Sequence, residues 1–141
     1  MDALAQQIDD QIGSRGTADA LIENLQVDGR LVPNPTPPAI DVYPADPFQE
    51  ALAYGLANNE MFFTVRARVS TSDNEGGQDL LLSLMDPDAA TSLAQAVLAN
   101  RTLGSVVERV GSVLGPSQYG LFGDPNGASW LGCTWTVRII P

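Results

Sequence analysis

Two stretches of the chain alternate between apolar and polar side chains, and this alternation limits the possible folds more than any other feature. The stretches are "MFFTVRARVS", residues 61–70, and "WLGCTWTVRI", residues 130–139. Successive side chains of a β-strand point to opposite faces, so each stretch predicts a strand with one apolar face. The apolar positions are Met61, Phe63, Val65, Ala67 and Val69 in the first, and Leu131, Cys133, Trp135, Val137 and Ile139 in the second.

Other segments show the spacing of amphipathic helices. Leu4, Ile8 and Ile12 recur every four residues at the N-terminus, and a second short helix is expected from residue 17 to 25. Further helices are expected over 47–59, after Asp46-Pro47, over 74–85, and over 87–99. The last of these would open at Asp86-Pro87-Asp88, where a cap precedes a proline in the first turn.

The remaining patterns complete an α+β fold. Residues 39–44 predict a short strand, and a long irregular strand is expected from about residue 108, bent at Gly111, Gly115 and Pro116. The turn "GDPNGA" then makes a hairpin of the last two strands. We expect an antiparallel or mixed sheet of four to five strands with helices packed on one face.

The chain of 141 residues is expected to form a single domain, 1–141. It would begin with an N-terminal helical segment, 1–26, followed by a proline-rich extended arm, 27–39. Proline removes backbone donors, so this arm is not expected at the centre of a sheet. It is either a surface linker or an arm laid across a neighbouring molecule.

The composition excludes several kinds of chemistry. The chain has no histidine, all seven basic residues are arginine, and Cys133 is the one cysteine. A Ser-His pair, a P-loop lysine, a Schiff-base lysine and a His/Cys zinc site are therefore impossible within this chain. Cys133 lies on the apolar side of its strand and is expected to be a buried, inert thiol. We expect no enzyme activity, no cofactor and no metal.

The net charge of −10 limits the partners. Such a surface repels phosphate backbones, so specific nucleic-acid binding and binding to anionic membranes are not expected. No apolar run approaches the ~18 residues of a membrane helix, and the N-terminus lacks the pattern of a signal peptide. We expect the chain to be cytosolic when it is made.

The acidic segment "SDNEGG", residues 72–77, could be a site or a connector. An EF-hand would need ligands at alternating positions and a distant closing glutamate, whereas Asp73 and Glu75 are bunched before two glycines. Helix capping explains these acids, and it also explains Asp86 and Asp88. A small carboxylate-using enzyme or calcium-binding module built on these four acids stays open as an alternative.

The polar sides of the two alternating strands carry arginines, threonines and one large aromatic each. Phe62 and Trp130 are the aromatics, and Arg66, Arg68 and Arg138 are the arginines. Aromatic residues and arginine together, without lysine, are typical of a protein interface. The simpler interpretation is that single exposed aromatics are ordinary on protein surfaces.

The order of these segments resembles a known family. The phrases "NPTPPAIDVYP", "FFTVRARVSTSDNEGGQDLLLSLMD", "RTLGSVVERV" and "WLGCTWTVRII" are similar to tail terminator proteins of long-tailed bacteriophages, over residues 28–140. The resemblance implies a virion protein of the tail neck, present in the host cytoplasm during assembly. It implies a hexameric ring that ends the tail tube, contacts the major tail tube protein and docks the head-tail connector. The family has no catalytic residues to carry over.

Two surfaces follow as expectations from this resemblance. Phe62, Trp130 and the three arginines would form the subunit interface, with Arg66, Arg68 and Arg138 pairing with acids of the adjacent subunit. The acidic loop from Asp73 to Glu75 would face the lumen, where carboxylates repel DNA and let it slide. Another phage head-tail joining or tail completion protein, and a host-directed binding protein, are alternative functions.

Overall fold

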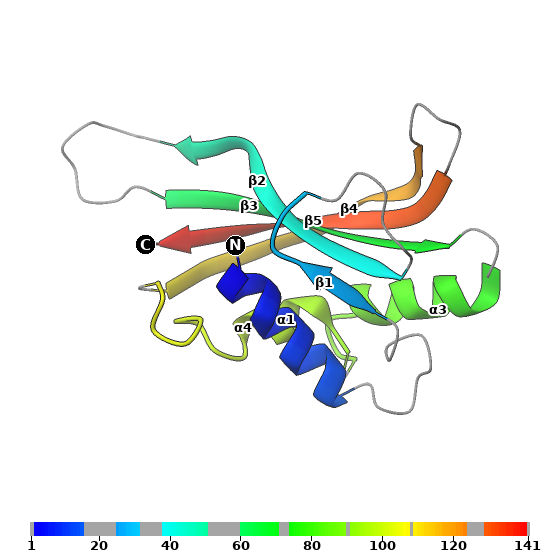
Figure 1. The fold of residues 1–141 in the computed structure, drawn as a ribbon, viewed down its shortest axis with the longest axis horizontal. Helices are drawn as coiled ribbons and strands as arrows, with labels where there is room; N and C mark the ends of the chain where they lie inside the picture. Colours follow the sequence, from blue (N-terminus) through cyan, green and yellow to red (C-terminus); the bar gives the residue numbers. More distant parts are fainter. Residues whose placement is uncertain are drawn as a thin grey trace.

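A computed structural model of the protein describes residues 2–15, 25–31, 38–50, 60–70, 74–89, 91–107, 109–123 and 129–140. These residues form an α+β fold with an open, mixed sheet of five strands in the order β1-β2-β3-β5-β4. The strands are β1 (Gln26–Asp28), β2 (Ala39–Glu50), β3 (Glu60–Ser70), β4 (Arg109–Gly123) and β5 (Ser129–Ile140). The helices are α1 (Asp2–Arg15), α3 (Asn74–Met85) and α4 (Leu93–Leu98). All three helices lie on the same side of the sheet (Figure 1). The predicted fold class is therefore confirmed.

The alternation of apolar and polar side chains in β3 and β5 predicted the buried face of the sheet correctly. The side chains of Val65, Trp135 and Val137 are buried against the helices. Their partners are Leu80, Leu81 and Leu84 of α3, Leu93 and Val97 of α4, and Leu4, Ile8 and Ile12 of α1. Helix α3 approaches β3 closely at Gly77, where an added Cβ would lie 3.1 Å from a methyl group of Val69. A glycine at this position lets the helix backbone pack directly on the strand.

The predicted helix over 47–59 is wrong in its first residues. Strand β2 continues to Glu50, and Gln49 and Glu50 pair with Met61 and Glu60 of β3. Asp46-Pro47 favours a helix locally, but backbone pairing with β3 determines the conformation here. Secondary-structure propensity is a weaker influence than tertiary pairing. Residues 51–59 lie outside the described part of the chain.

The predicted helix over 87–99 begins too early. The backbone N–H of Asp88 donates to Asp86 Oδ1 at 2.9 Å, and residues 87–89 form a turn. Ser92 caps the helix instead, because its hydroxyl accepts a hydrogen bond from Gln95 N–H. Thus Asp86 caps a turn and not the predicted helix, and α4 itself covers only Leu93–Leu98.

The N-terminal predictions are confirmed in part. Helix α1 matches the first predicted helix, but Leu25 is not helical and Gln26 begins β1, so the second predicted helix ends too late. Residues 17–24 lie outside the described part. The predicted arm, 27–39, begins inside β1, which pairs in parallel with the start of β2. Residues 32–37 of the arm are also outside the described part.

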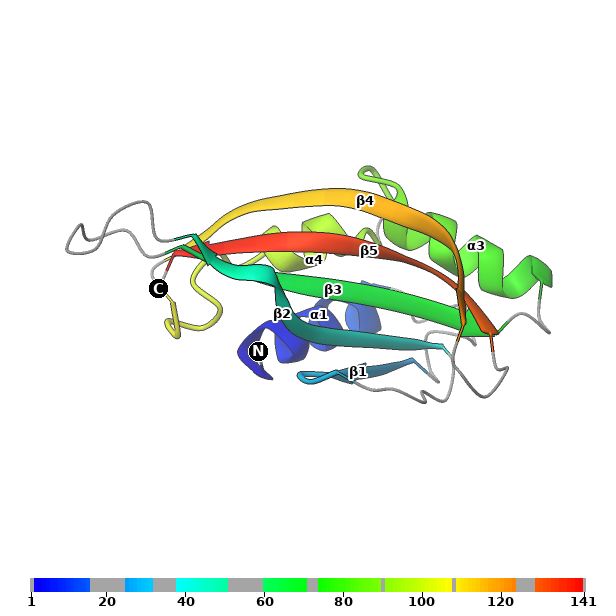
Figure 2. The same cartoon turned by 90° about the horizontal axis from the view of Figure 1, so that it is seen from above.

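The last two strands form the predicted antiparallel hairpin. The β4–β5 register shifts at Gly111 and between Leu114 and Ser117, close to the predicted bends. Gly115 has a φ of +113°, a conformation that other residues rarely adopt, and its position would place a Cβ 3.0 Å from Thr134 O. Seen from above, β4 and β5 curve together along their length (Figure 2). The bent hairpin shapes the face of the sheet that lies opposite the described helices.

Candidate functional site: the uncovered face of the sheet

A buried ion cluster lies on the face of the sheet opposite the helices. Asp41 of β2 stands across from Arg66 of β3 in the antiparallel register. Arg66 donates two hydrogen bonds to this carboxylate, from Nε to Oδ1 at 3.1 Å and from Nη2 to Oδ2 at 2.7 Å. Arg68 Nη2 lies 3.4 Å from the same Oδ2. One carboxylate thus faces two guanidinium groups, and such forked contacts fix the geometry of the pair.

The cluster is shielded from water although none of the described helices covers it. The side chains of Asp41 and Arg68 are each only 2% exposed, and that of Arg66 is 15% exposed. Burial lowers the pKa of Arg68, and the nearby Asp41 carboxylate opposes that shift. A guanidinium stays charged in proteins, and the paired carboxylate offsets the cost of burying that charge.

Aromatic rings complete the shield. The guanidinium carbon of Arg68 lies 5.3 Å from the centre of the Trp130 ring, and that of Arg66 lies 5.1 Å from the centre of the Tyr43 ring. Both distances fit cation–π contacts. Burial raises the pKa of Tyr43, and Arg66 opposes this shift, so the phenol is protonated near neutral pH. Trp130, which the sequence placed at an interface, is 8% exposed because it packs beside Arg68 within this chain.

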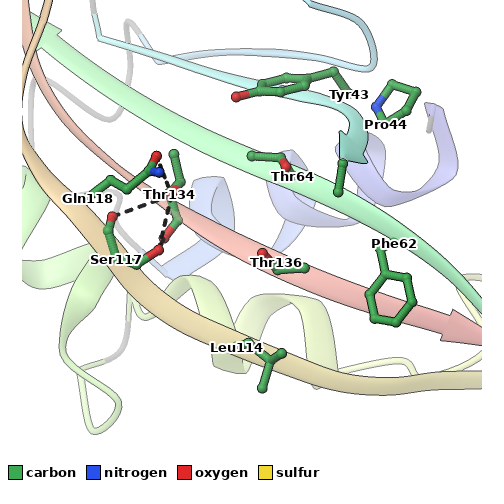
Figure 3. A pocket seen from close by; sticks show the side chains of 10 residues that line it. Tyr43, Pro44, Phe62, Thr64, Leu114, Ser117, Gln118, Thr134 and Thr136 are labelled. Carbon is green, nitrogen blue, oxygen red and sulfur yellow. Dashed lines mark hydrogen bonds between the residues drawn. The ribbon is translucent and has the colours of Figure 1, made fainter. Parts of the chain in front are cut away.

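A groove of about 480 Å³ lies next to the cluster on the same face. Four strands contribute to it, and Figure 3 shows these side chains with the helices behind the sheet. The lining includes two aromatic residues and the hydroxyl groups of one serine and three threonines. The lining residues are Tyr43, Pro44, Ala45, Phe62, Thr64, Leu114, Ser117, Gln118, Thr134 and Thr136. None of these residues carries a charge at neutral pH, in a chain whose net charge is −10.

Hydrogen bonds order the β4 side of the groove. The hydroxyls of Thr134 and Ser117 lie 3.2 Å apart, and Thr134 Oγ1 also donates to Gln118 Oε1 at 3.4 Å (Figure 3). These contacts cross the register shift that follows Gly115. They hold the bent part of β4 against β5, so the groove wall is positioned by side-chain contacts as well as by the backbone ladder.

The five residues that the sequence placed at a subunit interface lie on one face of the sheet, but they make different contacts there. Phe62 lines the groove. Arg66 and Arg68 pair with Asp41, and Arg138 pairs with Glu60, so each arginine has a carboxylate partner within its own chain. The expectation that they pair with acids of an adjacent subunit is therefore not needed to explain them. That Phe62 and its neighbours form an interface stays a prediction.

Sequence reasoning missed Asp41, Tyr43 and the β4 residues of the groove. A signal was present for Asp41, because a carboxylate between two apolar residues in "AIDVYP" has to be paired if the strand is buried. The contribution of Ser117 and Gln118 depends on how β4 bends around Gly115, which a strand pattern cannot specify.

The acidic candidates are not brought together as a metal site. Asp73 lies outside the described residues, and Glu75 is in the first turn of α3. Asp86 and Asp88 meet in the exposed turn before α4. Among the described residues, no group of three or more acidic or cysteine side chains could hold a metal ion. None of the described helices has the length and apolarity needed to span a membrane.

Cys133 lies on the opposite, helix-covered face and is fully buried. Burial raises the pKa of its thiol to about 12. This thiol is therefore protonated at neutral pH and a poor nucleophile, as its place in the strand pattern predicted.

A comparison of the chain with models of protein families gives no match, and a comparison with curated proteins gives none either.

Proposed function

We propose that this chain is a structural virion protein, a tail terminator whose copies form a ring at the head-proximal end of a bacteriophage tail tube. The resemblance of residues 28–140 to that family supports the proposal. The observation that carries it is the uncharged groove on the uncovered face of the sheet. A sheet face with a hollow, aromatic side chains and exposed apolar residues is typical of a surface that docks another protein.

The proposed partners are further copies of the chain, the major tail tube protein and the head-tail connector. Phe62 and Leu114 lie on opposite sides of the groove floor, on β3 and β4 (Figure 3). A partner side chain inserted between them would displace water from apolar surface, and the surrounding hydroxyls would satisfy polar atoms of the partner. The groove therefore suits an uncharged protein segment better than a charged ligand.

The proposal is tested by mixing purified protein with purified tail tubes that lack their terminator. Electron microscopy should show a ring of density at one tube end, and tube growth should stop. Thr136→Glu places a charge on the groove floor and should abolish capping if the groove docks a partner. Leu82→Glu, at an exposed apolar residue of α3, is the matched control and should cap normally. Tubes that stay uncapped with the wild-type protein would contradict the proposal.

The same proposal assigns a role to the acidic segment from Asp73 to Glu75, which includes the first turn of α3. Asp73 and Glu75 would face the lumen of the ring and repel the DNA backbone. Replacing both with arginine should leave ring assembly intact and slow DNA ejection, because arginine contacts with phosphate bind strongly. The rate of DNA release from virions assembled with each protein measures this effect. Equal rates would show that this segment does not line the path of the DNA.

A further inference from the structure

Strand β4 forms one edge of the sheet and is unusually exposed for its length. It has 15 residues, and its Leu114, Tyr119 and Leu121 side chains are exposed, Leu121 by 71%. An edge strand presents backbone N–H and C=O groups that can pair with another chain, and proteins usually protect such strands with charged side chains. Arg109, at the first position, is the one charged residue of β4.

The acidic residues of the chain are distributed unevenly across the sheet. The sequence contains 17 acidic residues. None of them lies in the 15 residues of β4 or the 12 residues of its neighbour β5, which carry Arg109 and Arg138. The opposite edge has an excess of acids, because Asp2 and Asp9 of α1 and Asp28 of β1 line one hollow there together with a single cation, Arg30. We refer to these two regions as the β4 edge and the acidic edge.

The two edges lie at opposite ends of the strand order, β1-β2-β3-β5-β4. They are also complementary in charge and character. Two copies of a chain with a net charge of −10 repel each other unless they meet where acids are absent. The β4 edge is such a place, and Arg109 adds an attraction toward carboxylates. The acidic edge offers those carboxylates on every copy.

From this asymmetry we infer that the β4 edge binds the acidic edge of a second copy of this chain. The contact is head-to-tail, so it uses two different surfaces and leaves one of each free on a dimer. Contacts of this kind close into rings when the rotation between copies permits. The inference rests on the ring assembly proposed above, but its test needs no phage component.

The test uses two variants, each with one damaged edge. The first carries Tyr119→Glu and Leu121→Glu, which place acids on the β4 edge. The second carries Asp9→Arg and Asp28→Arg, which reverse the acidic edge. Light scattering coupled to size exclusion should give an oligomer for the wild type and a monomer of 14.9 kDa for each variant alone. An equimolar mixture should give a species of twice that mass, because one intact edge remains on each partner.

Two control variants separate edge pairing from general surface adhesion. Leu82→Glu and Val106→Glu change exposed apolar residues that belong to neither edge, and both should assemble like the wild type. Circular dichroism melts of all variants should match the wild type, because every substituted side chain is at least partly exposed. A damaged-edge variant that melts at the wild-type temperature and yet stays monomeric has lost an interface rather than its fold.

Three outcomes would overturn the inference. A wild-type protein that is monomeric up to its solubility limit has no such contact. Self-association of the second variant alone would mean that β4 pairs with β4 in a symmetric dimer. A mixture that stays monomeric would mean that the two edges do not meet. If tail tubes are still capped in any of these cases, the inference fails and the proposed function stands. If the two edges pair but the tubes stay uncapped, the proposed function fails and the inference stands.

Discussion

The two faces of the sheet exclude water in different ways. On the helix-covered face, apolar side chains such as Val65 and Trp135 are fully buried against three helices. On the uncovered face, Asp41 and Arg68 are nearly as buried, although the three described helices all lie on the other side of the sheet. The first face is stabilised by removing apolar area from water, which does not depend on direction. The stability of the second face depends on charged atoms of opposite sign that lie within hydrogen-bonding distance of each other.

This difference determines how each face tolerates change. An apolar core accepts substitutions that keep volume and patterning. A buried charge costs several kcal/mol in desolvation, and only a well-placed partner offsets that cost. The helix-covered face should therefore be sensitive to polarity, and the uncovered face should be sensitive to the loss of any one member of its charge cluster.

The largest expected effect is on the helix-covered face. Val65→Asp should unfold the protein, because an unpaired carboxylate in the core costs on the order of the whole stability of a domain, about 5–15 kcal/mol. Thr64→Asp is the matched control, since Thr64 is the next residue on β3 and lines the groove on the other face. Urea unfolding measures both. A cooperatively folded Val65→Asp protein would show that the two faces do not differ as described.

A somewhat smaller effect is expected from the charge cluster. Asp41→Asn keeps the shape of the side chain but removes the negative charge between Arg66 and Arg68. Breaking a buried ion cluster in this way should lower the free energy of unfolding by about 3–5 kcal/mol. Replacing Asp41, Arg66 and Arg68 together with Leu, Met and Met should recover most of that loss, because no buried charge remains. A loss that persists in the triple variant would assign the effect to packing.

Alkaline pH tests the one thiol of the helix-covered face. Burial raises the pKa of Cys133 from 9.0 to about 12. Above pH 9 the unfolded chain loses a proton that the folded chain keeps, so this contribution to stability is complete below pH 9 and is lost as the pH rises toward 12. The expected slope from this group is at most about 1.4 kcal/mol per pH unit. In Cys133→Ala, the free energy of unfolding measured with urea should fall less steeply between about pH 9 and about pH 11 than in the wild type. Equal slopes in the two proteins would contradict the assignment.

The smallest effect is expected at the exposed ion pair of the uncovered face. Arg138 pairs with Glu60, and this hydrogen bond raises the pKa of the guanidinium. The Arg138 side chain is 39% exposed, so water and salt screen the pair. Arg138→Gln should change the free energy of unfolding much less than Asp41→Asn does. A loss as large as that of Asp41→Asn would remove the distinction between buried and exposed pairs on this face.

The sequence predicted the fold where a pattern is long and locally consistent. The strands at 60–70 and 129–140, and the helix at 74–85, follow from periodicity over ten or more residues. It failed where a short local signal competed with pairing. Asp46-Pro47 favours a helix, but the ladder between Gln49 and Met61 extends β2 through this point. Asp86-Pro87 forms a turn, and α4 begins only at Leu93, after the cap Ser92.

The candidate site could be predicted only in part. The sequence indicated that Phe62 and three arginines share a face, because they share the parity of their strands. It did not indicate that Asp41 lies opposite Arg66, because this depends on the register between β2 and β3. It also gave no sign of the groove, whose wall comes from the bend of β4 after Gly115.

The sequence by itself determined which side of each main strand is apolar, the absence of histidine and lysine chemistry, and the absence of acids from the two strands of the C-terminal hairpin. These properties depend on residue identity and on a period of two, which is fixed by the geometry of the strand. Only the tertiary structure decided the partner of each arginine. A guanidinium binds whichever carboxylate the sheet register brings within about 3 Å, and that register is set by contacts between residues far apart in the chain.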